Sequence, residues 1–89
     1  MVSFANDIRP LFSQEDVECM STFGVLLDDY EYMADSAGNG QYADHANART
    51  VHYRLTPAAG GARMPEGGPY WSGQQIALYE QWMSDGFAA

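Results

Sequence analysis

The strongest helix signal in the chain is Ser72-Gly73-Gln74-Gln75-Ile76-Ala77-Leu78-Tyr79-Glu80-Gln81-Trp82-Met83-Ser84-Asp85-Gly86. Ser72 and Gln75 have the spacing of a capping box, in which each side chain accepts a hydrogen bond from the other residue's backbone N–H. Apolar side chains recur on one face at the i, i+3, i+6, i+7 spacing: Ile76, Tyr79, Trp82 and Met83. Gly86 follows as a C-terminal stop. The sequence therefore predicts an amphipathic helix here.

The opposite end of the chain carries a second helix signal. Ser3 is a suitable cap for a helix predicted over residues 4–13. Its apolar face has the i, i+4, i+7, i+8 spacing and consists of Phe4, Ile8, Leu11 and Phe12. Pro10 lies inside this helix and cannot donate to the carbonyl of Asn6, so we expect a bend there.

Shorter elements are expected between these two ends. Residues 13–24 are polar and mixed, and helix is predicted to extend through Cys19. A short helix is predicted after them, with an apolar stripe of Leu26, Leu27, Tyr30 and Met33. Gly38-Asn39-Gly40 is expected to break the chain, because all three residues tolerate positive φ.

A further helix is predicted over residues 41–55 and ends at Thr56-Pro57. Residues 58–70 are rich in Gly and Pro and predict a long irregular loop. The chain is therefore expected to form one all-α domain over residues 1–89, with three to five short helices.

Composition narrows the possible partners. Twelve carboxylates against four Arg, with no Lys, give a net charge of −8. Such a surface disfavours nucleic acid and anionic membrane and suits either solubility or docking to a basic patch on another protein. A single cysteine excludes an internal disulfide and any multi-cysteine zinc or iron–sulfur site. No membrane span and no export signal are evident, so a cytoplasmic location is expected.

Three segments carry a resemblance to a known family. Phe4-Ala5-Asn6-Asp7-Ile8-Arg9-Pro10-Leu11-Phe12 is similar to the opening helix of many bacterial mono-haem cytochrome c domains. Arg63-Met64-Pro65 resembles the segment that supplies the methionine ligand of the haem, and the stretch from Ser72 to Gly86 resembles the terminal helix. The chain thus resembles a cytochrome c-like domain at both ends and less in the middle. The resemblance implies that the N- and C-terminal helices pack across each other.

The family's haem-attachment motif, Cys-x-x-Cys-His, is degenerate in this chain. By distance from Phe12 it falls on Asp16-Val17-Glu18-Cys19-Met20. Asp16 then replaces the first cysteine, and Met20 replaces the histidine that is the stronger iron ligand. Cys19 alone remains. The resemblance therefore implies a haem-free protein with vestigial haem positions Asp16, Cys19, Met20 and Met64, and neither cofactor nor metal is expected.

A haem-free cytochrome fold needs a substitute for the haem volume. Cavities destabilise proteins by about 24 cal/mol per Å³. We therefore expect side chains from the middle of the chain to fill the space, the candidates being Phe23, Leu26, Leu27, Tyr30, Tyr32, Met33, Tyr42, Tyr53, Tyr70 and Trp71.

Two alternatives give the vestigial positions a chemical role. Cys19, Met20 and Met64 are soft donors that could hold copper(I). Met20 and Met64 could also hold a non-covalent haem, or a haem attached once through Cys19. His45 and His52 are seven residues apart, about 10 Å along a helix, which is too far for one metal ion. We expect these two histidines to pair with nearby carboxylates.

The residue pattern does not favour catalysis. It contains no Ser/His/Asp or Cys/His constellation and no phosphate-binding Gly motif, so no catalytic residue is predicted. Tyr70 and Trp71 suit a protein interface, because Tyr and Trp dominate interface hot spots, or they close the core over the missing haem. The favoured hypothesis is a non-catalytic accessory protein whose partner is a larger enzyme, by analogy an oxidoreductase.

Overall fold

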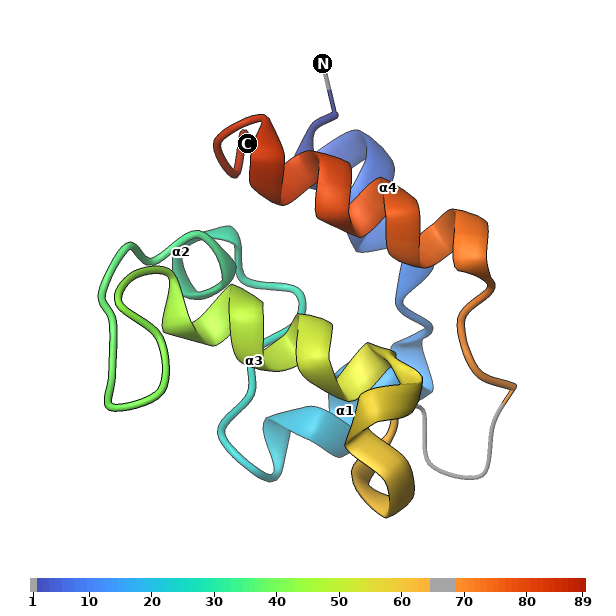
Figure 1. The fold of residues 1–89 in the computed structure, drawn as a ribbon. Coiled ribbons are helices and arrows are strands. Elements are labelled where there is room, and N and C mark those ends of the chain that lie inside the picture. Colours follow the sequence, from blue (N-terminus) through green and yellow to red (C-terminus); the bar gives the residue numbers. More distant parts are fainter. Residues whose placement is uncertain (1, 65–68) are drawn as a thin grey trace.

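The structure, a computed structural model, describes residues 2–64 and 69–89. All regular structure within these two ranges is helical, which confirms the all-α prediction (Figure 1). The elements in chain order are η1 (Phe4–Ile8), η2 (Arg9–Leu11), α1 (Gln14–Ser21), α2 (Tyr30–Met33), α3 (Ala46–Leu55), η3 (Pro57–Ala62) and α4 (Gly73–Ser84). No helix among the described residues is long and apolar enough to cross a membrane.

The last helix, α4, follows its prediction closely. Ser72 Oγ accepts a hydrogen bond from Gln75 N at 3.2 Å, and Gln75 Oε1 accepts one from Ser72 N at 2.8 Å, so the capping box is present. Tyr79 and Trp82 are completely buried. The chain leaves the helix through Gly86, whose φ of 101° is accessible to glycine without a side-chain clash.

The N-terminal segment is capped as predicted but is not one helix. Ser3 Oγ accepts from Asn6 N at 3.3 Å. The first turn, η1, is a π-helix, and the second, η2, is a 3₁₀-helix that contains Pro10. Because proline lacks an N–H, the α-helical ladder is interrupted, and the helical backbone ends at Leu11 instead of residue 13.

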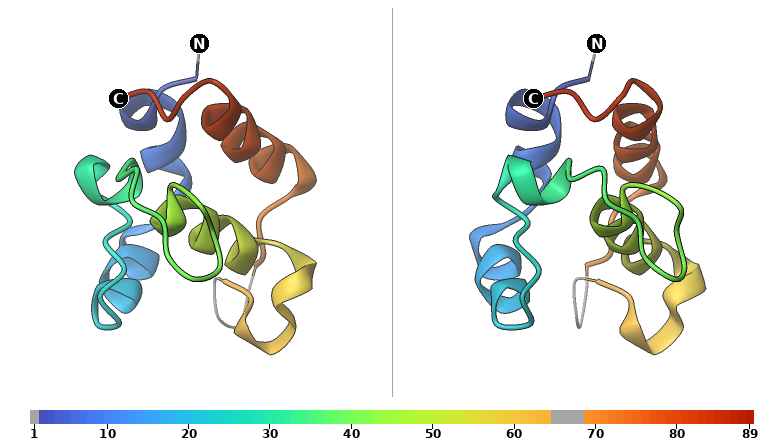
Figure 2. Two further views of the ribbon diagram at one scale, coloured as in Figure 1. Left: turned by 60° about the vertical axis from the view of Figure 1, so that its left-hand side comes forward. Right: turned by 90° about the vertical axis from the view of Figure 1, so that its left-hand side faces the viewer.

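The two ends of the chain pack against each other, as expected. Figures 1 and 2 show η1 beside α4, with the two termini close together. The rings of Phe4 and Trp82 lie 5.7 Å apart. Phe4 N donates to Ala88 O at 2.8 Å and Ala5 N donates to Ala89 O at 2.9 Å, so backbone hydrogen bonds also join the ends.

The middle of the chain differs from the prediction in its helix limits. Helix α1 has a capping box of its own, formed by Ser13 and Asp16, which the sequence reading missed. Helix α2 covers four residues, because Asp29 caps it and accepts from Glu31 N at 3.0 Å. Leu26 lies outside α2 and is 37% exposed, so only part of the predicted apolar stripe is helical.

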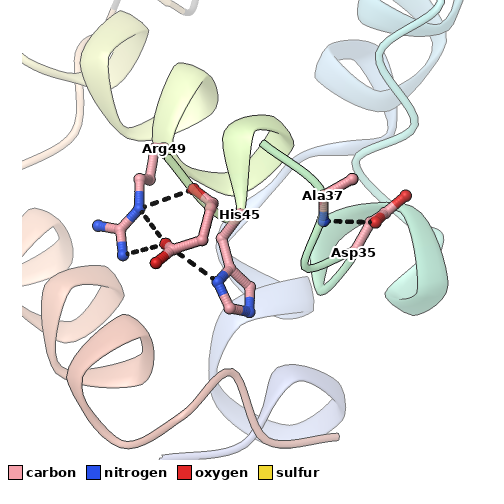
Figure 3. A network of polar contacts seen from close by, with 5 residues as sticks. Asp35, Ala37, His45 and Arg49 are labelled. Carbon is pink, nitrogen blue, oxygen red and sulfur yellow. Dashed lines mark hydrogen bonds and ion pairs between the residues drawn. The ribbon is translucent and has the colours of Figure 1, made fainter. Parts of the chain in front are cut away.

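Helix α3 begins at Ala46, not at residue 41. Residue His45 has a left-handed conformation with φ of 45° and donates its backbone N–H to Ser36 O at 3.1 Å, which ties residues 41–45 into a loop. The Asp44 carboxylate accepts hydrogen bonds from Arg49 Nη2 at 2.7 Å and pairs with His45 Nδ1 at 3.2 Å (Figure 3). Hydrogen bonds from Arg49, and then from His45, lower the pKa of Asp44.

Two expectations about loops also need correction. The irregular loop predicted after residue 57 begins with the 3₁₀-helix η3. Neither Gly38 nor Gly40 has positive φ, so the break at Gly38-Asn39-Gly40 has another cause. A Cβ atom at Gly38 would overlap the backbone carbonyl of Ala43, whereas one at Gly40 would meet nothing within 4 Å. The loop needs glycine at residue 38 because the backbone passes so close to it.

The loop before α3 generates the first prediction. Replacing Gly38→Ala should lower the free energy of unfolding by about 1–3 kcal/mol, because two backbone segments must move apart. The matched change Gly40→Ala should leave stability equal or raise it by up to about 1 kcal/mol, because it only restricts the unfolded chain. Urea unfolding followed by circular dichroism measures both. Equal losses in the two variants would contradict the close approach at Gly38.

Burial of Tyr79 generates the second prediction. Its hydroxyl donates to Ala48 O at 2.8 Å. Burial raises the pKa of Tyr79 well above its ordinary value, and Tyr32 adds to the rise. In the unfolded chain the Tyr79 hydroxyl loses its proton near pH 10, whereas in the folded chain it keeps the proton to higher pH. The stability that Tyr79 contributes is therefore fully present below about pH 10 and falls as the pH rises further.

Replacing Tyr79→Phe should therefore have two effects. The free energy of unfolding at pH 7 should fall by about 0.5–1.5 kcal/mol, because the buried hydrogen bond from the Tyr79 hydroxyl to Ala48 O is lost. The further loss of stability between about pH 9.5 and 11 should become smaller than in the parent protein. Urea unfolding at several pH values tests this, with Tyr53→Phe, an exposed tyrosine, as control. If the Tyr79→Phe variant lost as much free energy of unfolding at alkaline pH as the parent protein does, the prediction would be wrong.

Candidate functional site

A crevice of about 370 Å³ lies at one end of the molecule. It is lined from one side by α1 and the turn after it, and from the other by the end of α3 and the segment through η3. Figure 2 shows α1 and η3 on either side of this end in its right-hand view. The volume is within the range of sites that bind small molecules or the side chains of a partner.

The first wall is one face of α1, continued by the turn after it. Asp16, Cys19, Met20 and Phe23 all line the crevice. Their i, i+3, i+4, i+7 spacing places them on the same side of a helix. Met20 is buried and Cys19 is exposed. Phe23 is 75% exposed, so most of its ring is in contact with solvent.

The second wall comes from two segments held together by hydrogen bonds. Arg54 and Leu55 end α3, and Arg63 and Met64 follow η3. Met64 N donates to Arg54 O at 2.6 Å, and Arg63 Nε donates to Leu55 O at 3.4 Å. Met64 is buried. These bonds join the segment that carries Met64 and Arg63 to the end of α3, and they hold the side chain of Arg63 on this side of the crevice.

The crevice adjoins the hydrophobic core through Phe12 and Trp71, which both line it. Their ring centroids are 5.1 Å apart. Trp71 is only 6% exposed, and its ring also lies 6.1 Å from that of Tyr79 in α4. This wall is therefore held by packing against residues that stabilise the whole fold.

The four residues that the resemblance groups around a haem line one crevice. Asp16, Cys19, Met20 and Met64 line the same crevice although Met64 is far from the others in sequence. Pro65, the last residue of the Arg63-Met64-Pro65 segment, lies outside the described residues. The two predicted interaction residues take different places, because Trp71 is buried in the crevice wall whereas Tyr70 is 48% exposed.

The expectation that side chains from the middle of the chain fill the haem volume stays a prediction, although Leu27, Met33 and Trp71 are buried in the core. Of the candidates, only Phe23 and Trp71 line the crevice, and it remains open between them. The other candidates are held elsewhere by their own contacts. Tyr30, for example, donates its hydroxyl to Phe87 O at 2.7 Å, and Tyr53 donates to Ala58 O at 3.1 Å. Leu27 and Met33 belong to the core and do not line the crevice.

The two arginines of the crevice were not anticipated from the sequence. Arg54 and Arg63 lie nine residues apart on different segments, and nothing in their spacing predicts that both line one crevice. Asp16 is the acidic group among the described residues of the lining, and its carboxylate accepts from Ser13 N at 3.4 Å. The guanidinium of Arg63 lies 4.3 Å from the centre of the Tyr70 ring, a cation–π contact.

The two histidines lie outside the crevice and pair with carboxylates, as predicted. His45 Nδ1 is 3.2 Å from Asp44 Oδ1, and His52 Nε2 is 2.8 Å from Glu80 Oε2. Within the described ranges, no three His, Cys, Asp or Glu side chains converge in a way that could hold a metal ion. The sulfur-containing residues that line the crevice are Cys19, Met20 and Met64.

Comparisons of the chain with protein-family models, with curated proteins and with solved structures find no match. The geometry of the crevice is therefore the basis for inferring function.

Proposed function

We propose that the chain is a non-catalytic accessory protein that docks to a larger protein through the crevice. The observation that carries this proposal is Phe23, which is 75% exposed beside an apolar crevice. Exposed apolar groups next to a concave apolar surface are typical of protein-binding sites. A partner side chain that entered the crevice would be covered by Phe23 on one side and would contact Trp71 on the other.

Among the described residues no histidine lines the crevice beside Cys19, which supports a non-catalytic role. Cysteine needs a neighbouring base or a lowered pKa to act as a nucleophile in an enzyme. His45 and His52 pair with Asp44 and Glu80 outside the crevice lining. The other groups that line the crevice are mostly apolar.

The kind of partner follows from charge and from the resemblance. The chain carries a net charge of −8, which favours a basic surface around the docking site on the partner. The resemblance to a cytochrome c-like domain whose haem-attachment motif is degenerate suggests a larger enzyme, by analogy an oxidoreductase. Tyr70, exposed and in contact with Arg63 at the crevice, is placed to take part in the interface.

The third prediction uses Cys19, the only cysteine, as a handle. A benzophenone attached to Cys19 and irradiated in an extract of native cells should cross-link to a defined protein, identified by mass spectrometry. The same experiment with Phe23→Ser should lose the product, because the exposed ring no longer covers the partner side chain. Since Phe23 is exposed, this change should alter the free energy of unfolding by less than about 0.5 kcal/mol.

A matched control places the same label away from the crevice. Cys19→Ser combined with Ser84→Cys moves the label to the exposed end of α4. This variant should not capture the protein. Equal capture from both positions, or capture that survives Phe23→Ser, would contradict docking through the crevice.

A second candidate function is a soft-metal or haem carrier. The observation that favours it is the convergence of Cys19, Met20 and Met64 on one crevice. Sulfur donors prefer copper(I), whereas haem iron is normally held by at least one stronger ligand such as histidine. Copper(I) is therefore the better fit to these residues.

The fourth prediction separates this candidate from the first. A carrier should bind about one equivalent of copper(I) under anaerobic conditions, and Met20→Leu and Met64→Leu should each weaken binding, because leucine keeps the volume and removes the donor. An absorption spectrum with haem supplied tests the haem alternative by its Soret band. If the protein stays colourless with haem and binds copper(I) no more tightly than the two variants do, the carrier hypothesis is wrong.

A further inference from the structure

The crevice holds half of the positive side chains of an acidic protein. The chain has four arginines and twelve carboxylates. Arg49 pairs with Asp44 at 2.7 Å, and Arg9 Nη1 donates to Phe12 O at 3.1 Å. The other two, Arg54 and Arg63, both line the crevice, and neither forms an ion pair with any residue in the described ranges.

Arg63 is held in a fixed position. Its guanidinium lies 4.3 Å from the centre of the Tyr70 ring, and its Nε donates to Leu55 O at 3.4 Å. A guanidinium carries five N–H donors, so most of its donors have no partner among the described residues. Arginine held in this way loses little conformational freedom when a carboxylate binds to it.

The carboxylate of Asp16, which also lines the crevice, does not cancel the positive charge of the two arginines. Asp16 contributes one negative charge against two from Arg54 and Arg63, so the described residues of the lining have a net charge of +1. The Asp16 carboxylate is also engaged at the start of α1 by Ser13 N. Most of the remaining lining is apolar, and an apolar concave wall strengthens the field of the charges beside it.

We infer that the segment of the partner protein that enters the crevice carries a carboxylate next to its apolar side chain. This inference rests on the proposed docking function. The apolar side chain contacts Phe23 and Trp71, and the carboxylate binds Arg54 and Arg63. Elsewhere the acidic surface repels carboxylates, so an acidic group on the partner is tolerated at the crevice and disfavoured around it. That pattern fixes the orientation in which the partner docks.

Matched peptides test the inference. Three capped heptapeptides carry a central Leu flanked by two Glu, two Gln or two Lys, and binding is followed by ¹⁵N–¹H NMR through the Trp71 indole N–H. The Glu peptide should bind about three- to fivefold more tightly than the Gln peptide, the gain of a partly exposed ion pair, and the Lys peptide should bind most weakly. Arg54→Gln and Arg63→Gln should each reduce the preference for Glu. Arg49→Gln, which removes the same charge elsewhere, should preserve it.

The outcomes separate this inference from the docking function. Equal binding of the Glu and Gln peptides at the crevice would overturn the carboxylate preference and leave docking intact. Cross-linking from Cys19 with no peptide binding would likewise overturn it. If phenylacetate, a free aromatic acid, bound more tightly than every peptide, the crevice would be a site for a small carboxylic acid. The inference that a protein segment supplies the carboxylate would then be wrong. Failure of both the peptides and the cross-link would overturn the inference and the docking function together.

Discussion

The indole of Trp82 holds the two ends of the chain together. Its ring is completely buried and lies within 6 Å of three aromatic neighbours, Phe4, Tyr79 and Phe87. Its N–H donates to Ala88 O at 2.8 Å, which fixes the C-terminal residues that in turn accept from the backbone of η1. The turns η1 and η2 are too short to be stable alone, because helices of this length are marginal in water. The position of Phe12, and with it one wall of the crevice, therefore depends on packing against α4.

The features that could be predicted from the sequence are those with local causes. The capping box of Ser72 and Gln75 and the cap at Ser3 involve residues three positions apart, and both are present. The pairing of both histidines with carboxylates was also predicted correctly. The start of α3 was wrong because it depends on hydrogen bonds from His45 and Ala46 back to residues 36 and 37, across a loop whose path the spacing of apolar residues does not determine.

The candidate site was predicted in part. The resemblance grouped Asp16, Cys19, Met20 and Met64, and these residues line one crevice, whereas most of the side chains expected to fill a haem volume lie elsewhere. The composition gives the number of aromatic side chains, but it does not show which of them pack elsewhere in the fold. Two tyrosine hydroxyls from the middle of the chain donate to backbone acceptors, that of Tyr30 to Phe87 O and that of Tyr53 to Ala58 O. The convergence of Arg54 and Arg63 depends on how η3 turns the chain back toward α3, which no local pattern encodes.

Trp71 belongs both to the crevice wall and to the core, through its contact with Tyr79. An occupant of the crevice that contacts this ring therefore stabilises the folded state by an amount set by its concentration relative to its dissociation constant. A domain of 89 residues has a small margin of stability, and changes of one or two kcal/mol alter the fraction of unfolded chains that cellular proteases degrade. If the proposed docking takes place, the amount of this protein in a cell is coupled to the amount of the docked protein, because unoccupied chains are degraded sooner than occupied ones.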